Sequence, residues 1–234
     1  MLKIYIISPF PNLLNSILDE SMLRKAVERN KVEYNIINLF DFLDNHERID
    51  DYPYGGGKGM IMKAEPIFNA VESIDASINK VIYPSPDGKL FNQSIALDYS
   101  KETSLVFICG HYKGIDQRVR DTIVTDEISI GDFVLTNGEL PTLVILDAII
   151  RLIPGVLNDY DSAKTDSFFD ELLDGPYYTR PKKFREMEVP DILTSGNHSK
   201  IEEWFLEKKI SKTKRRRKDL YEKYKSKYNG DENE

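Results

Sequence analysis

The chain has 234 residues, of which 41% are hydrophobic and 30% are charged, and its formal net charge is −7. This composition is typical of a soluble globular protein and excludes a disordered chain, and the length suits one large domain or two small ones. No apolar run approaches the roughly 20 residues that a membrane span needs. The single cysteine excludes an internal disulfide and a cysteine-rich zinc site, and the three histidines are scattered. We therefore expect a cytoplasmic protein with no metal site and no membrane partner.

The first half of the chain alternates short apolar runs with helical patterns. β-rich runs predict four strands, at 3–7, 32–40, 80–84 and 104–109. Apolar helical faces predict three helices, at 13–27, 93–101 and 139–153. The N-terminal run is interpreted as a strand and not a signal peptide, because it lacks a basic region and a cleavage site. Near-continuous apolar strands between helices indicate an α/β domain, whose mostly parallel sheet is covered by helices on both faces.

The amino-acid composition of the chain changes after residue 157. Residues 159–174 are acidic and rich in small polar side chains, which is typical of a flexible linker. No strand is evident after 176, and two helices are predicted, over 199–209 and over the basic stretch that follows; the acidic tail is expected to fray. We therefore predict an α/β domain at 1–158, a flexible interdomain linker at 159–174 and a small helical domain at 175–234.

A strong positive charge is concentrated near the C-terminus. Residues 208–227 hold eleven Lys and Arg against two acids, a net charge of +9. A local basic stripe of this kind fits the phosphate backbone of RNA or DNA. A solvated helix that only keeps the protein soluble is an equally good explanation, so the charge by itself leaves both interpretations open.

Glycine-containing segments are the candidates for ligand contact. They are YGGGKGM at 54–60, SPDG at 85–88, CGHYKG at 109–114 and the stretch 129–141 before the long helix. The first matches neither a Walker A loop nor GxGxxG spacing, and its default interpretation is a flexible surface turn. The second and third each follow a predicted strand, where we expect a helix to begin. Because ligands bind beyond the carboxyl ends of strands in open α/β sheets, these loops predict a pocket, with the ligand unspecified.

Eight motifs in one order carry a resemblance to a known family. They are YGGGKGM, SPDG, CGHYKGID, SIGDFVLTNGELP, RLIPGVL, DSF, LLDGPYYTRP and LTSGNH. Together they closely resemble the bacterial tRNA (guanine-N1)-methyltransferases, which modify guanosine 37 next to the anticodon, from residue 1 to about residue 218. The resemblance implies an S-adenosylmethionine-dependent enzyme, a trefoil-knotted (SPOUT-like) cofactor domain and a helical tRNA-binding domain. It also implies a homodimer whose active sites are shared between the subunits.

The resemblance implies roles for individual residues as well. Asp166 matches the family's general base, which would take the proton from guanine N1, and Arg151 matches the basic group that would stabilise charge on O6 and position Asp166. The residues of the cofactor pocket are Pro86, Gly110, Tyr112, Ile130, Gly131, Asp132, Phe133, Val134, Leu135, Gly138 and Pro141. The residues expected to contact RNA are Ser167, Lys214, Arg215, Arg216 and Arg217.

Two residues depart from the family's pattern. Lys113 stands where the family usually has a glutamate associated with magnesium, so the need for Mg²⁺ is left open. Asn137 stands where the family commonly has glycine, and asparagine tolerates a left-handed turn better than most residues. A knotted methyltransferase that acts on another RNA position, and an RNA-binding module without catalysis, are the alternative functions.

Overall fold

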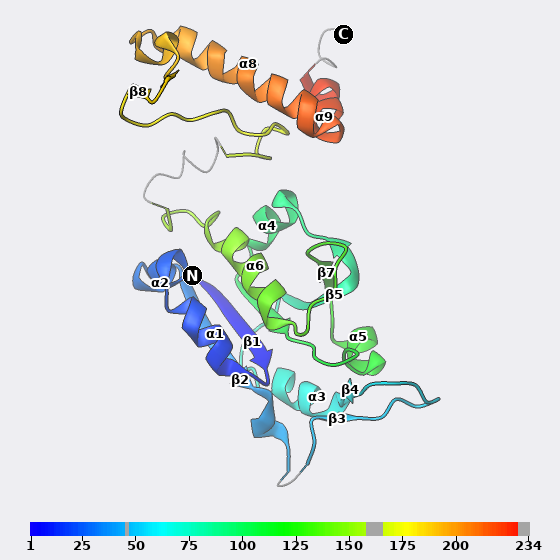
Figure 1. The fold of residues 1–234 in the computed structure, drawn as a ribbon. Helices are drawn as coiled ribbons and strands as arrows, with labels where there is room; N and C mark the ends of the chain where they lie inside the picture. The colour runs from blue at the N-terminus through cyan, green and yellow to red at the C-terminus, as the bar shows by residue number, and fades with distance from the viewer. Residues whose placement is uncertain (45–46, 158–165, 229–234) are drawn as a thin grey trace. The chain divides into compact units, whose positions relative to one another are not determined.

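The computed structural model describes residues 1–44, 47–157 and 166–228, and the chain divides into two compact units, Met1–Tyr160 and Asp161–Glu234 (Figure 1). Within the described residues, no helix is both long enough and apolar enough to cross a membrane. The first unit carries the parallel sheet, and the second consists mainly of two helices.

The first unit is built on a five-stranded sheet in the order β2-β1-β6-β5-β7, and every neighbouring pair is parallel. The strands are β1 (Leu2–Ser8), β2 (Val32–Asn38), β5 (Lys80–Leu90), β6 (Ser104–Ile108) and β7 (Asp126–Ser129). The four predicted strands and the parallel sheet are thus confirmed. The sequence alone did not reveal β7, because its four residues, DEIS, include two acids and give little apolar signal. The trefoil knot stays a prediction.

The central strand β6 shows why helices cover both faces of this sheet. Leu105 and Phe107 contribute to one core cluster, Val106 and Ile108 contribute to the other, and all four are fully buried. The first cluster is covered by α1 (Pro11–Leu18), α2 (Ser21–Glu28), α4 (Gln93–Tyr99) and α6 (Glu139–Ile150). The second is covered by η1 (Leu39–Phe42), α3 (Ala64–Glu72) and α5 (Gln117–Thr122). A strand buried on both faces reads as an uninterrupted apolar run, which made β6 recognisable in the sequence.

The helical face predicted over 13–27 is divided between α1 and α2. Leu14 and Leu18 of α1 are buried in the core. The apolar pattern over 13–27 also places Ile17 and Val27 on this face, but they are 38% and 41% exposed, so that part of the prediction is wrong. Because α1 ends at Leu18 and α2 begins at Ser21, residues 13–27 do not form one continuous helix and do not share one helical face.

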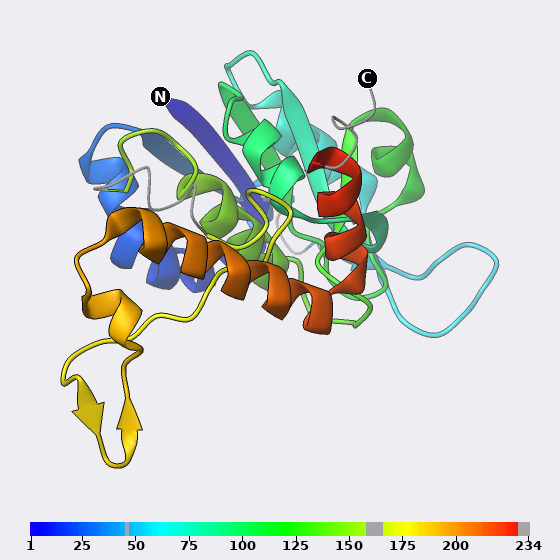
Figure 2. The ribbon, with the colours of Figure 1, turned by 90° about the horizontal axis from the view of Figure 1, so that it is seen from above.

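The glycine-rich segment 54–60 joins the two short antiparallel strands β3 (Asp50–Asp51) and β4 (Ile61–Met62). Tyr54 is fully exposed, and glycines 55, 56, 57 and 59 have φ between +81° and +123°, a region that favours glycine. Figure 2 shows this loop, in light blue, extending away from the sheet. The segment is therefore a surface loop, as its default interpretation predicted.

The second unit contains the two predicted helices, α8 (His198–Arg216) and α9 (Lys218–Tyr228). The basic stretch is divided between them, since α8 continues to Arg216. Before them lie β8 (Lys183–Phe184), β9 (Met187–Glu188) and the 3₁₀ helix η2 (Asp191–Thr194). The expectation of no strand after 176 is wrong, because strands of two residues are too short to produce a periodic pattern.

The described part of the predicted linker is held against α8. Leu172 is fully buried, the N–H of Leu173 donates to Thr213 Oγ1 at 2.8 Å, and Lys209 pairs with Asp170 at 2.6 Å. Residues 159–165 of that linker and the predicted frayed tail at 229–234 lie outside the described residues. The limits of the linker therefore stay a prediction.

Candidate active site

A cavity of about 350 Å³ opens where the parallel strands end. Its size is in the range of about 300–1,000 Å³ that is usual for small-molecule sites. Ten of the residues predicted for the cofactor line this cavity: Pro86, Gly110, Tyr112, Ile130, Gly131, Phe133, Val134, Leu135, Gly138 and Pro141. Asp132 is not among the lining residues. The structure thus gathers segments 86, 110–112 and 130–141 around one cavity.

The SPDG segment reaches the cavity through an irregularity inside β5. Pro84 and Lys89 both pair with Ile128 of β7, so residues 85–88 bulge from the strand between them. The segment therefore does not separate a strand from a helix, and that expectation is corrected. A Cβ at Gly88 would lie 2.4 Å from backbone atoms of β7, so this close approach requires glycine.

Two further glycines bring the walls of the cavity close together. The N–H of Gly138 donates to the carbonyl of Gly110 at 2.8 Å, and Asn137 forms an antiparallel bridge with His111. A Cβ at Gly110 would lie 2.7 Å from the Tyr83 ring. The loop after β6 and the segment before α6 are therefore hydrogen-bonded to each other through their backbones. The distance between the two backbones leaves room for glycine only.

The charged side chains of one wall neutralise one another. Arg120 forms ion pairs with Glu127 at 2.6 Å and with Asp87 at 2.7 Å. Its guanidinium carbon lies 5.6 Å from the centroid of the Tyr83 ring. The hydrogen bond to Glu127, supported by the bond to Asp87, raises the pKa of Arg120. The sequence analysis missed this network, since its partners are far apart in the chain and match no motif.

The single cysteine precedes the cavity-lining Gly110 and is fully buried. Burial, with a further contribution from the Glu139 carboxylate, raises the pKa of the Cys109 thiol, which keeps the thiol protonated and unreactive. No group of three His, Cys, Asp or Glu side chains that could hold a metal ion occurs in residues 1–44, 47–157 and 166–228. Lys113, whose side chain departs from the pattern expected from the resemblance, lines the cavity.

The two residues predicted to act in catalysis belong to different units. Arg151 is the C-cap of α6 in the first unit, and Asp166 lies in the second. Both side chains are partly exposed. Ser167 is also in the second unit, and its Oγ accepts a hydrogen bond from the N–H of Asp174 at 2.9 Å.

The basic residues predicted to contact RNA lie at the C-terminal end of α8. Lys214, Arg215, Arg216 and Arg217 are all exposed. Arg217 forms an ion pair with Asp219 at 2.5 Å, which stabilises the junction between α8 and α9. The other three side chains extend the positive surface of the helix.

Comparison with known proteins connects these features to one family. The family model of tRNA (Guanine-1)-methyltransferase TrmD matches residues 2–223. A tRNA (guanine-N(1)-)-methyltransferase of Clostridioides difficile (strain 630) is 50% identical over 227 residues, which cover 95% of this chain and 98% of that protein. A protein of the same name from Staphylococcus aureus (strain JH9) is 48% identical over 225 residues, which cover 95% and 92%. The similarity therefore includes both units.

Proposed function

We propose that this chain, which belongs to the tRNA (guanine-1)-methyltransferase TrmD family, transfers a methyl group from S-adenosylmethionine to N1 of guanosine 37 in tRNA. Family membership confirms the resemblance carried by the eight motifs. The observation that carries the proposal is the cavity that gathers the loops at 86, 110–112 and 130–141. A cavity of this kind is what a methyl donor of nucleoside size requires.

The lining of the cavity fits S-adenosylmethionine. Glycines 110, 131 and 138 line the cavity, and the absence of side chains there would let the adenine and ribose of the cofactor approach the main chain closely. Phe133 and Val134 are 53% and 83% exposed beside the cavity, so a bound cofactor would cover apolar surface that now contacts water. The side-chain oxygen of Asn137 is buried with no hydrogen-bond partner among the described residues, which leaves an acceptor for a ligand's N–H or O–H group. The cofactor supplies a methyl group activated by its sulfonium charge.

The chain's own residues then act on the guanine. Its N1 carries a proton in the neutral base, so methylation at N1 requires a proton acceptor. Asp166 would take this proton, and Arg151 would stabilise the charge that develops on O6 and orient Asp166. We place this reaction in the cytoplasm and in a homodimer, in which the Asp166 of one subunit acts at the cavity of its partner.

The basic end of α8 would hold the tRNA. Its exposed Lys and Arg residues neutralise phosphates without reading sequence, so they supply affinity and leave the choice of guanosine to the active site. Extrusion of the target base from its stack would then expose N1 to the cavity.

Mass spectrometry of the product tests the function directly. Purified protein with unmodified tRNA and S-adenosylmethionine is expected to yield 1-methylguanosine at position 37. A methylated ribose or a different modified base would favour a methyltransferase for another RNA position. Binding of tRNA without any methylation would favour the RNA-binding module.

A single substitution tests the base. Asp166→Asn should keep cofactor affinity and strongly depress methyl transfer, because an amide cannot accept the N1 proton. Asp191→Asn is the matched control, since Asp191 is a 91% exposed aspartate of the same unit. A rate near that of the unmodified protein in Asp166→Asn would exclude Asp166 as the base.

A further inference from the structure

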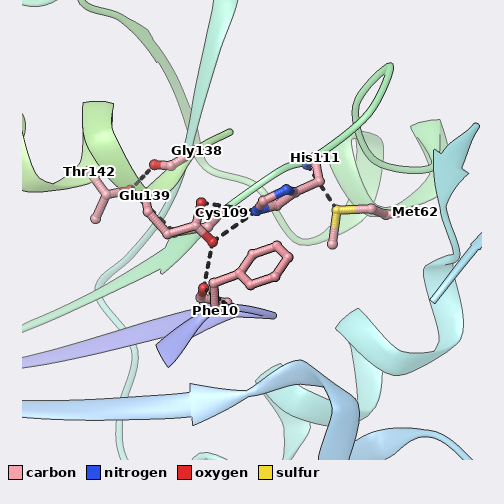
Figure 3. Close-up of polar contacts among 8 residues, drawn as sticks. Phe10, Met62, Cys109, His111, Gly138, Glu139 and Thr142 are labelled. Carbon is pink, nitrogen blue, oxygen red and sulfur yellow. Dashed lines mark hydrogen bonds and ion pairs between the residues drawn. The ribbon is translucent and has the colours of Figure 1, made fainter. Parts of the chain in front are cut away.

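A buried carboxylate lies beside the wall of the cavity. Glu139, the first residue of α6, is fully buried and faces His111 (Figure 3). Its Oε1 accepts a hydrogen bond from Ser8 Oγ at 2.5 Å. Both carboxylate oxygens lie 2.9 Å from Nε2 of His111. We assign the proton of this contact to Nε2, because a carboxylate only accepts.

The environment of Glu139 makes these hydrogen bonds important. A carboxylate removed from water is strongly destabilised unless donors replace its hydration shell. Ser8 and His111 supply such donors from the end of β1 and from the loop after β6. Losing either donor leaves a buried acceptor incompletely satisfied, and the surrounding loops would then shift to let water in.

His111 is held by more than its bond to Glu139. Its backbone N–H donates to Met62 Sδ at 3.0 Å, and its ring lies 4.9 Å from the ring of Phe10. Only 11% of its side chain is exposed. The imidazole therefore has one well-defined position, in which Nε2 faces the carboxylate, as Figure 3 shows.

The buried pair joins the same two segments that form the cavity. Gly110, His111 and Tyr112 follow one another in the chain and line the cavity, as does Gly138, which precedes Glu139; Ser8 and Glu139 are not among the lining residues. The side-chain contact between His111 and Glu139 runs beside the backbone hydrogen bond between Gly138 and Gly110. Loss of the contact between His111 and Glu139 is therefore expected to displace the backbones that the hydrogen bond between Gly138 and Gly110 joins.

We propose that Ser8, His111 and Glu139 form a positioning cluster that holds the loop 110–114 and the segment 131–138 at the separation required for binding S-adenosylmethionine. Ser8 and Glu139 are positioning residues in this inference, because they do not line the cavity and act through the backbones of Gly110 and Gly138. His111 lines the cavity as well, so Ser8→Ala and Glu139→Gln distinguish positioning from a direct contact of His111 with the ligand. The inference rests on the proposed function, since it takes the ligand of the cavity to be this cofactor.

Isothermal calorimetry with S-adenosylmethionine tests the cluster on the full-length protein. His111→Ala removes the donor and should weaken cofactor binding by about tenfold or more, which corresponds to about 1.4 kcal/mol. His111→Gln places an amide N–H close to the position of Nε2 and should restore the affinity to within about threefold of the unmodified protein. With tRNA, the KM for the cofactor should rise in Glu139→Gln, a change at a residue that does not line the cavity, while kcat at saturating cofactor changes by less than about twofold.

Hydrogen exchange of the ligand-free protein supplies a second measurement that does not depend on activity. Backbone amides of 110–114 and 131–138 should exchange faster in His111→Ala and in Glu139→Gln than in the unmodified protein. Val32→Ala is the control, because Val32 is 1% exposed in β2 and does not line the cavity. It should lower the melting temperature and leave cofactor affinity and these amides unchanged.

The outcomes separate this inference from the proposed function. Unchanged affinity and exchange in folded His111→Ala and Glu139→Gln would overturn it, as would an equal loss of affinity in Val32→Ala. If His111→Ala does not fold, Ser8→Ala and Glu139→Gln make the same comparison. If the unmodified protein does not bind S-adenosylmethionine, the proposed function fails, and the exchange experiment alone decides whether the cluster holds the loops.

Discussion

Gly138→Ala is the most direct perturbation of the cavity. A Cβ at this position would lie 2.7 Å from the backbone N of Gly110 and 2.8 Å from Cα of Cys109. The backbone of Gly138 has φ −86° and ψ −10°, which an alanine adopts without strain. The effect of the substitution is therefore steric and not conformational.

The size of the effect follows from these contacts. Ordinary contact of a Cβ begins at 3.4 Å, so the loop must move by about 0.7 Å, and it cannot yield by rotating a side chain because the obstructing atoms are backbone. The same movement would stretch the 2.8 Å hydrogen bond from Gly138 to Gly110 beyond useful range. Overpacking of this kind destabilises the original arrangement of the loop by about 1–3 kcal/mol. If the bound state requires the original separation, the dissociation constant for S-adenosylmethionine should rise about 5- to 150-fold.

Calorimetry with S-adenosylmethionine measures this change, and Gly56→Ala is its control. A Cβ at Gly56 meets nothing within 4 Å, and this residue of the 54–60 loop does not line the cavity. Its φ of +81° means that alanine there adds backbone strain of about 1–2 kcal/mol without closing the cavity, so cofactor affinity should stay the same. An unchanged affinity in folded Gly138→Ala would refute the reasoning.

Three further predictions concern RNA, magnesium and the dimer. Replacing the arginines at 215–217 with glutamine should weaken tRNA binding and make it less dependent on salt, because fewer counterions are released. If the variant and the unmodified protein bound tRNA equally at several salt concentrations, the basic stretch would serve only solubility. Lys113→Glu should make methyl transfer respond more strongly to Mg²⁺, since a carboxylate is a magnesium ligand and an ammonium repels the ion; Lys113→Gln is the control, and identical magnesium titrations of the glutamate variant and the unmodified protein would contradict the prediction. A mixed dimer of Asp166→Ala and Gly110→Trp subunits should regain up to half the activity per dimer if the site is shared, because one of its two sites then carries neither change. An inactive mixed dimer, shown to be folded and mixed, would place the whole site in one subunit.

Much of the first unit follows from local patterns in the sequence. The run SLVFI of β6 is buried on both faces, and such a run is recognisable wherever it lies in a chain. The helical pattern from 139 likewise predicted α6, although its buried Glu139 gave no sign of its partners. The order of the eight motifs was enough to identify the family, because a match in register over most of the chain does not require knowledge of any contact.

The tertiary structure decided the contacts that shape the cavity. Ser8 and Glu139 are 131 positions apart, and Arg120 and Asp87 are 33 apart, so no local pattern connects either pair. The bulge at 85–88 also depends on β7, whose backbone leaves no room for a side chain at Gly88. Periodicity in a sequence reports how one element is buried, whereas the pairing of charges and the close approach of backbones depend on which elements the fold brings together. The sequence by itself therefore determined four of the five strands of the parallel sheet, most of the helices and the family. Only the packed sheet decided how its loops form one cavity.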